Sequence, residues 1–220
     1  MEKLPIGVFT SIGSGLGASL DAVTGLGVRT VQLHTPPGAM RSPEKAQEIR
    51  GQFADAGIAV TVVFCGFEGE SYETIPTVQE TIGLVPRARR AARLKETLDV
   101  ADFAQGLGVD AIGMHRGAVP EDTRHAEFAG IVEAVRLVCE YCKGNGQYFH
   151  LETGQETADA LLRFIRTVDR ENLAINFDPA NMILYGAGEP IAALKKLGKY
   201  VRSVHCKDAK VTRRPDQKWY

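Results

Sequence analysis

Two carboxylates and one imidazole occur near the ends of three short apolar runs in the second half of the chain. The side chains are Glu152, Asp178 and His205, and their runs are residues 148–153, 173–178 and 201–208. Each run is apolar enough to be a buried parallel strand, and the carboxyl ends of such strands collect the chemistry of an α/β barrel. Meeting there, these side chains would form three ligands of a divalent-cation site with open positions for a substrate.

Glycines divide the chain into repeating units that could place those strands side by side. Gly27, Gly57, Gly108 and Gly146 each follow a helix-like segment and lead into a short β-branched run. Glycine just past a helix end readily adopts the left-handed conformation that terminates many helices. Each of these glycines therefore predicts a corner between a helix and a strand, and the repeating unit is one strand plus one helix.

Seven strands alternating with helices are predicted. The four earlier strands are expected at residues 6–11, 30–34, 59–65 and 111–115, and the helices at 43–56, 87–105, 121–143, 157–168 and 190–197. This alternation favours a parallel sheet with helical crossovers. Because no Gly-x-Gly-x-x-Gly follows the first strand and polar residues end many strands, we expect an α/β fold of the TIM-type (β/α)8 barrel class rather than a doubly wound sheet.

The predicted strand count is one short of a closed barrel. A TIM barrel has eight strands and about 250 residues, whereas this sequence has 220 residues. We expect a single TIM-barrel domain over 1–220 with the eighth βα unit missing. Because an open sheet would leave the edges of its first and last strands unpaired, either a longer chain or a neighbouring subunit, as in a homo-oligomer, is expected to cover the gap.

Composition excludes several classes of partner. The chain has 26 Lys and Arg against 27 Asp and Glu, so its charge shows no bias toward nucleic acid or an anionic membrane. No apolar run approaches the ~20 residues that span a bilayer, and the first residues lack the apolar core of a signal peptide. We therefore expect a cytoplasmic protein. Its four cysteines form no disulfide framework and are expected to be ordinary thiols.

Two connections at the same end of the predicted barrel are candidates for binding a ligand. Residues 66–86 are much longer than a usual strand-to-helix connection, and we expect them to form a flap over the site. Residues 177–182 are expected to form a loop after the sixth strand, in which Asn181 lies one turn beyond Asp178. Asn181 is therefore expected to contact a ligand.

Four motifs occur in order along the chain. They are Gly-Met-His-Arg-Gly at 113–117, Leu-Glu-Thr-Gly-Gln-Glu at 151–156, Asn-Phe-Asp-Pro-Ala-Asn at 176–181 and Val-His-Cys-Lys-Asp at 204–208. Together they resemble the sugar phosphate isomerase/epimerase family, which has the xylose isomerase-like TIM barrel. The resemblance implies that Glu152, Asp178 and His205 bind one divalent ion, with Mn²⁺ favoured over Mg²⁺, Co²⁺ and Zn²⁺. The family's fourth ligand, a glutamate on the eighth strand that is also its second acid/base group, has no counterpart in these 220 residues.

The implied reaction is the isomerisation or epimerisation of a sugar, keto-sugar or sugar phosphate. Glu152 would transfer a proton at the carbon next to a metal-chelated carbonyl. His115, Glu156, Asn181 and Lys207 are candidate substrate-binding residues. Each has a simpler reading: Glu156, for example, is favoured at a helix start by the helix dipole, and Lys207 could neutralise the acidic cluster. Two residues before Glu152, His150 is expected to serve a core or supporting role.

Three other functions are compatible with the same motifs. Proton abstraction beside a carbonyl also begins elimination, which makes a keto-sugar or cyclitol dehydratase or lyase an alternative. A metal phosphodiesterase resembling endonuclease IV is less favoured, because that chemistry uses a histidine-rich three-zinc cluster and this chain has Cys65 and Asn181 where histidines would be expected. A non-catalytic, degenerate subunit is the remaining alternative.

Overall fold

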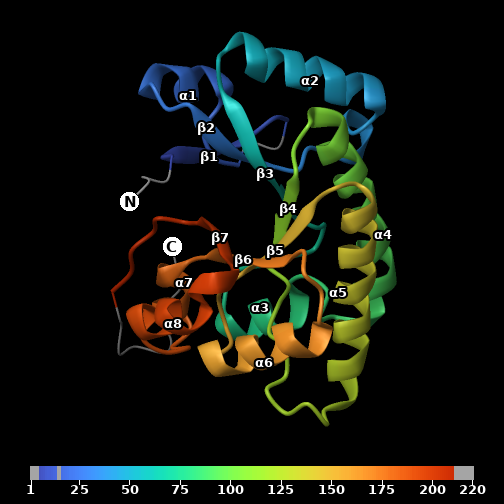
Figure 1. The fold of residues 1–220 in the computed structure, drawn as a ribbon, viewed down its shortest axis with the longest axis vertical. Coiled ribbons are helices and arrows are strands. Elements are labelled where there is room, and N and C mark those ends of the chain that lie inside the picture. Colours follow the sequence, from blue (N-terminus) through green and yellow to red (C-terminus); the bar gives the residue numbers. More distant parts are fainter. Residues whose placement is uncertain (1–4, 14–15, 211–220) are drawn as a thin grey trace.

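The fold is a curled, seven-stranded parallel sheet whose strands follow one another in chain order, seen here in a computed structural model that describes residues 5–13 and 16–210. The strands are β1 (Gly7–Ser11), β2 (Thr30–His34), β3 (Ala59–Cys65), β4 (Ala111–Met114), β5 (Tyr148–Glu152), β6 (Leu173–Phe177) and β7 (Val201–Val204). Figure 1 shows them as an open curl with β1 and β7 at its two ends. The expected α/β architecture is confirmed as a partial (β/α)8 barrel.

Helices cover the outer side of the curl (Figure 1). They are α1 (Leu20–Leu26), α2 (Pro43–Asp55), α3 (Ile75–Thr81), α4 (Arg87–Leu107), α5 (Ala126–Gly144), α6 (Ala158–Val168), α7 (Pro179–Leu184) and α8 (Pro190–Leu197), with short 3₁₀ turns at Gly38–Met40 and Gly198–Tyr200. The side chains of Ser42 and Thr157 cap α2 and α6 by accepting from backbone N–H groups three residues on. Within the described residues, no helix combines the length and apolarity that a membrane crossing requires.

The structure corrects several predicted boundaries. The helix expected from residue 121 begins at Ala126, because residues 121–125 turn around Asp122, whose side chain accepts from the Arg124 backbone N–H. The last strand ends at Val204 rather than 208. Residues after Asp178 form helix α7 instead of an open loop, because Pro179 suits the first helical position and Asp178 caps the helix.

Side chains alternate between the two faces of each strand and so separate an apolar layer from a polar one. Ile112, Phe149, Leu151 and Ile175 are fully buried and belong to the large core formed by the sheet and its helices. In the register of β5 and β6, the core residues Leu151 and Ile175 lie opposite each other. The next pair along the strands is Glu152 and Asn176. The polar residues therefore face the inside of the curl.

The long connection after β3 is anchored at both of its ends. The Glu70 carboxylate accepts hydrogen bonds from the backbone N–H groups of Phe67 at 3.1 Å and Gly83 at 2.7 Å. Arg93, which is buried on α4, donates to the Thr81 and Gly83 carbonyls at 2.6 and 2.7 Å. These bonds fix residues 66–86, the flap, against α4, and the flap contains α3, which the sequence did not predict.

Gly83 gives a sharp test of this anchoring. Its φ is +65°, and a Cβ there would overlap the backbone carbonyl of Arg116. Gly83→Ala should therefore lower the free energy of unfolding by about 1–3 kcal/mol, since backbone cannot move aside cheaply. Gly51, inside α2 with open space around it, is the matched control. Gly51→Ala should raise the same quantity by about 0.5–1 kcal/mol. Urea unfolding measures both, and equal effects would contradict the described flap.

Candidate metal centre

The three candidate metal ligands meet at the carboxyl ends of three adjacent strands. Glu152 is the last residue of β5, Asp178 directly follows β6, and His205 directly follows β7. One ligand atom from each lies within 4.8 Å of the other two. Local bonds place them: Thr153 Oγ1 exchanges hydrogen bonds with the backbone of Asp178, and the His205 N–H donates to the Phe177 carbonyl at 2.9 Å.

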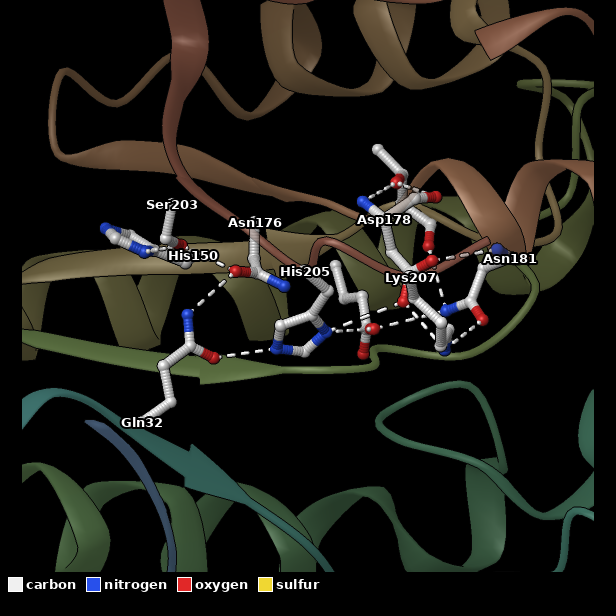
Figure 2. A network of polar contacts seen from close by, with 10 residues as sticks. Gln32, His150, Asn176, Asp178, Asn181, Ser203, His205 and Lys207 are labelled. Carbon is white, nitrogen blue, oxygen red and sulfur yellow. Dashed lines mark hydrogen bonds and ion pairs between the residues drawn. The ribbon is translucent and has the colours of Figure 1, made fainter. Parts of the chain in front are cut away.

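Charge-assisted contacts link the cluster internally (Figure 2). His205 Nδ1 lies 2.9 Å from Glu152 Oε1 and 3.5 Å from Asp178 Oδ2. Lys207 Nζ lies 2.8 Å from Asp178 Oδ2 and donates to Asn181 Oδ1 at 2.9 Å. Asn181 Nδ2 donates in turn to Glu152 Oε1 at 3.1 Å. All five residues thus belong to one network.

Burial and hydrogen bonding act in opposite directions on the charges of this network. Burial raises the pKa of Asp178, but hydrogen bonds from His205, Lys207 and the Asn181 backbone outweigh it and bring the pKa to about 2. Burial lowers the pKa of His205, whereas hydrogen bonds to Asp178 and Glu152 raise it overall to about 9. Asp178 is therefore ionised at neutral pH, and His205 carries two ring protons when no metal is bound.

The donor set fits a divalent cation. Asp178 is fully buried and Glu152 is 8% exposed, so their charges need a nearby positive partner. His205 and Lys207 supply that positive charge in this structure. A cation held by Glu152, Asp178 and His205 would replace the ring proton on Nδ1. Two carboxylate oxygens and one imidazole nitrogen suit Mn²⁺ or Mg²⁺, and the nitrogen also suits Co²⁺ or Zn²⁺.

A cavity of about 320 Å³ opens onto this cluster. Its walls include Phe9, Phe64, Glu152 and His205 from the barrel. The flap contributes Glu70, Tyr72, Thr74, Ile75 and Val78. The expected position of the flap over the site therefore agrees with the structure, and a small molecule bound here would be partly shielded from water.

His115 lines the cavity between two tyrosine rings. Its ring centroid lies 6.1 Å from that of Tyr72 and 6.3 Å from that of Tyr185, both in edge-on arrangements. Burial lowers the pKa of His115, so the imidazole is neutral. The Gly117 backbone N–H donates to Nδ1 at 3.4 Å, which leaves the ring proton on Nε2. Nε2 is buried and has no hydrogen-bond partner among the residues that the structure describes.

The other predicted substrate-binding residues separate into two groups. Asn181 and Lys207 line the cavity beside the metal centre. Glu156 instead forms a buried ion pair with Arg116, whose guanidinium lies 5.1 Å from the ring centroid of Phe164. Glu156 is not among the cavity-lining residues, and this ion pair joins the end of β4 to the connection that follows β5.

Sequence reasoning missed several polar residues inside the curl. Gln32, Asn176 and Ser203 belong to a hydrogen-bonded chain that reaches His205. One signal could have identified two of them: Gln32 and Asn176 interrupt apolar strands, and a buried polar side chain needs a partner. Tyr72 and Tyr185 were also missed, because nothing local in the sequence places the flap beside α7.

Comparisons with known proteins agree with this fold. A family model described as xylose isomerase-like TIM barrel matches residues 20–218. A xylose isomerase domain protein from Planctomyces limnophilus has a TM-score of 0.92 and 50% identity, over 97% of this chain and 77% of that one. No curated protein matched the sequence.

Two more distant structures share the fold. A xylose isomerase-like TIM barrel protein from Mycobacterium smegmatis, in complex with magnesium, has a TM-score of 0.67 and 19% identity, over 92% of this chain and 74% of that one. D-psicose 3-epimerase with D-tagatose, from Clostridium cellulolyticum H10, has a TM-score of 0.65 and 20% identity. That alignment covers 84% of this chain and 65% of the epimerase.

The raised pKa of His205 predicts a pH-dependent contribution to stability without metal. A group whose folded pKa exceeds its unfolded value of 6.5 stabilises fully below pH 6.5, and the contribution is lost as pH rises through about 9. With a chelator present, the unfolding free energies of wild type and His205→Gln should differ by about 3 kcal/mol more at pH 6 than at pH 10. Denaturant titrations at several pH values measure this, and a constant difference would contradict the described ion pairs.

Proposed function

Because the chain belongs to the xylose isomerase-like TIM barrel family, we propose that it is a divalent-metal-dependent isomerase or epimerase of a sugar, keto-sugar or sugar phosphate. The observation that carries the proposal is the convergence of Glu152, Asp178 and His205 within 4.8 Å, with Glu152 and His205 lining a small cavity. The 3-epimerase and the magnesium complex on the same scaffold support it. Residues 1–220 are proposed to act as one barrel domain in the cytoplasm.

Glu152, Asp178 and His205 would hold the ion, with Mn²⁺ proposed first. When bound there, the ion supplies Lewis acidity: it would chelate a substrate carbonyl and the adjacent hydroxyl and acidify the C–H bond next to the carbonyl. The buried pair of Glu152 and Asp178 brings two negative charges to this position, and Lys207 offsets part of that charge through Asp178. The protein thus provides a water-poor site matched to a doubly charged ion.

Glu152 is proposed to take up and return the substrate proton. Its carboxylate extends from the rigid end of β5 and is oriented by the Asn181 side-chain amide at 3.1 Å. A proton transferred from carbon would reside on a Glu152 oxygen until it is returned. His115 lines the same cavity and is proposed to contact the substrate through its ring. Lys207 and Asn181 are proposed to bind further hydroxyl oxygens.

The structure favours this chemistry over a three-zinc phosphodiesterase. Among residues 5–13 and 16–210, Glu152, Asp178 and His205 form the sole group of three or more His, Cys, Asp and Glu side chains with metal-binding spacing. The three-zinc chemistry would need a histidine at the end of the third strand, where this chain has Cys65. The Cys65 thiol is buried, and burial raises its pKa. A neutral buried thiol is a poor zinc ligand.

Deuterium exchange tests the proposed reaction directly. With Mn²⁺, the protein should catalyse deuterium incorporation from D₂O beside the carbonyl of at least one member of a ketose and ketose-phosphate panel, read by NMR. Glu152→Gln should lower that rate by about 10²–10⁴-fold, because the proton acceptor is lost. Glu171→Gln, at an exposed glutamate, is the control and should leave the rate unchanged. Metal binding without exchange in any sugar would exclude the isomerase assignment, and loss of water from the substrate would favour a dehydratase.

A further inference from the structure

A chain of polar side chains runs through the barrel interior next to the metal centre (Figure 2). His205 Nε2 lies 2.7 Å from Gln32 Oε1, and Gln32 Nε2 lies 3.1 Å from Asn176 Oδ1. Ser203 Oγ lies 2.7 Å from the same Asn176 oxygen, and His150 Nδ1 lies 2.9 Å from Ser203 Oγ. These residues come from β2, β5, β6 and β7, so the curl of the whole sheet assembles the chain.

The direction of donation follows from the chemistry of each group. An amide oxygen can only accept, so Gln32 Oε1 must receive the proton of His205 Nε2–H. The Asn176 oxygen accepts from both the Gln32 amide and the Ser203 hydroxyl. A Gln32 amide turned over by itself would bring its oxygen against the Asn176 oxygen, two acceptors without a proton between them. With the Asn176 oxygen toward Gln32, as it is in this structure, the Gln32 oxygen faces His205.

The ring of His205 is already confined sterically. Phe9 meets it edge-on with ring centroids 6.0 Å apart, and Phe64 lies tilted against it at 5.3 Å. Packing does not determine which ring nitrogen carries the proton of the neutral imidazole. The nitrogen that donates to a neighbour keeps its proton, and the other nitrogen offers a lone pair.

We propose that Gln32 is a positioning residue that fixes the tautomer of His205 for cation binding. By accepting from Nε2–H, Gln32 makes Nδ1 the nitrogen with the lone pair, and Nδ1 faces Glu152 and Asp178 at 2.9 and 3.5 Å. This role rests on the metal site of the proposed function. Without the Gln32 oxygen, the Nε2–H would lose this acceptor while Nδ1 binds the cation, and the cation-bound form of the ring would be destabilised.

An amide at position 32 suits this role better than an apolar side chain or a carboxylate. Gln32 accepts the ring proton and adds no third negative charge beside Glu152 and Asp178. Partners of this kind, which orient a histidine ligand, typically change metal affinity by about 10–100-fold when they are removed.

Gln32→Met, which keeps the side-chain length and removes the acceptor, tests the inference with two readouts. The first is ¹⁵N NMR of the His205 ring in protein loaded with Zn²⁺, a diamagnetic ion, with Nδ1 expected on the ion and the ring proton on Nε2. In wild type the bond to Gln32 should protect this Nε2–H from exchange with solvent, and in the variant it should exchange faster. The second readout is the Mn²⁺ dissociation constant from calorimetry, which should rise about 10–100-fold in the variant.

Three companion variants complete the design. Gln32→Glu retains an acceptor oxygen and should restore protection of the Nε2–H. Gln47→Met is the matched control, because Gln47 is an exposed glutamine on α2 that donates to the Gly106 carbonyl, and it should change neither readout. Gln32→Leu repeats the loss of the acceptor with another shape if Gln32→Met does not fold, as judged by circular dichroism.

The outcomes separate this inference from the proposed function. A Gln32→Met protein that keeps a protected Nε2–H and the wild-type Mn²⁺ affinity would overturn the role of Gln32 and leave the metal site standing. Wild-type protein that binds no Mn²⁺ would overturn the metal site of the proposed function, and the role of Gln32 with it.

Discussion

Two buried carboxylates, Glu152 and Asp178, lie at the ends of neighbouring strands, and the site depends on the positive side chains that pair with them. Asp178 is fully buried, and an isolated carboxylate at such a position would cost several kcal/mol. His205 and Lys207 compensate it, and both lie in the segment that follows β7. Their positions require β5, β6 and β7 to lie in register, so the arrangement of the strands and the electrostatics of the site support one another.

Hydrogen bonds between polar side chains organise the inside of the curl as much as apolar packing does. The face of each strand toward the helices belongs to the large core, whereas the inner face carries Phe9 and Phe64 together with Gln32, Asn176 and Ser203. Each inner polar group depends on a partner from another strand. Asn176 is fully buried, whereas Gln32 and Ser203 are half-buried. The loss of both partners would therefore leave the Asn176 oxygen buried without a hydrogen bond, which usually costs about 1–3 kcal/mol.

The flap connects the fold to the chemistry. Glu70 and Arg93 bond to its backbone and leave Tyr72 beside His115, so the wall of the cavity is set by contacts away from the metal centre. The buried pair of Arg116 and Glu156 joins β4 to the start of α6. His115, which lines the cavity, is followed directly by Arg116, and neither member of the ion pair lines the cavity.

The sequence by itself determined the class of fold and the three metal-binding candidates. Strand periodicity, glycine corners and helix caps depend on local chemistry, and the apolar runs ending near Glu152, Asp178 and His205 were visible without coordinates. Tertiary structure alone decided that Glu156 pairs with Arg116, that α3 lines the cavity, and that Gln32 reaches His205, 173 positions away in the chain. The physical reason is that hydrogen-bond partners and cavity walls depend on the curvature of the sheet, which no single segment encodes.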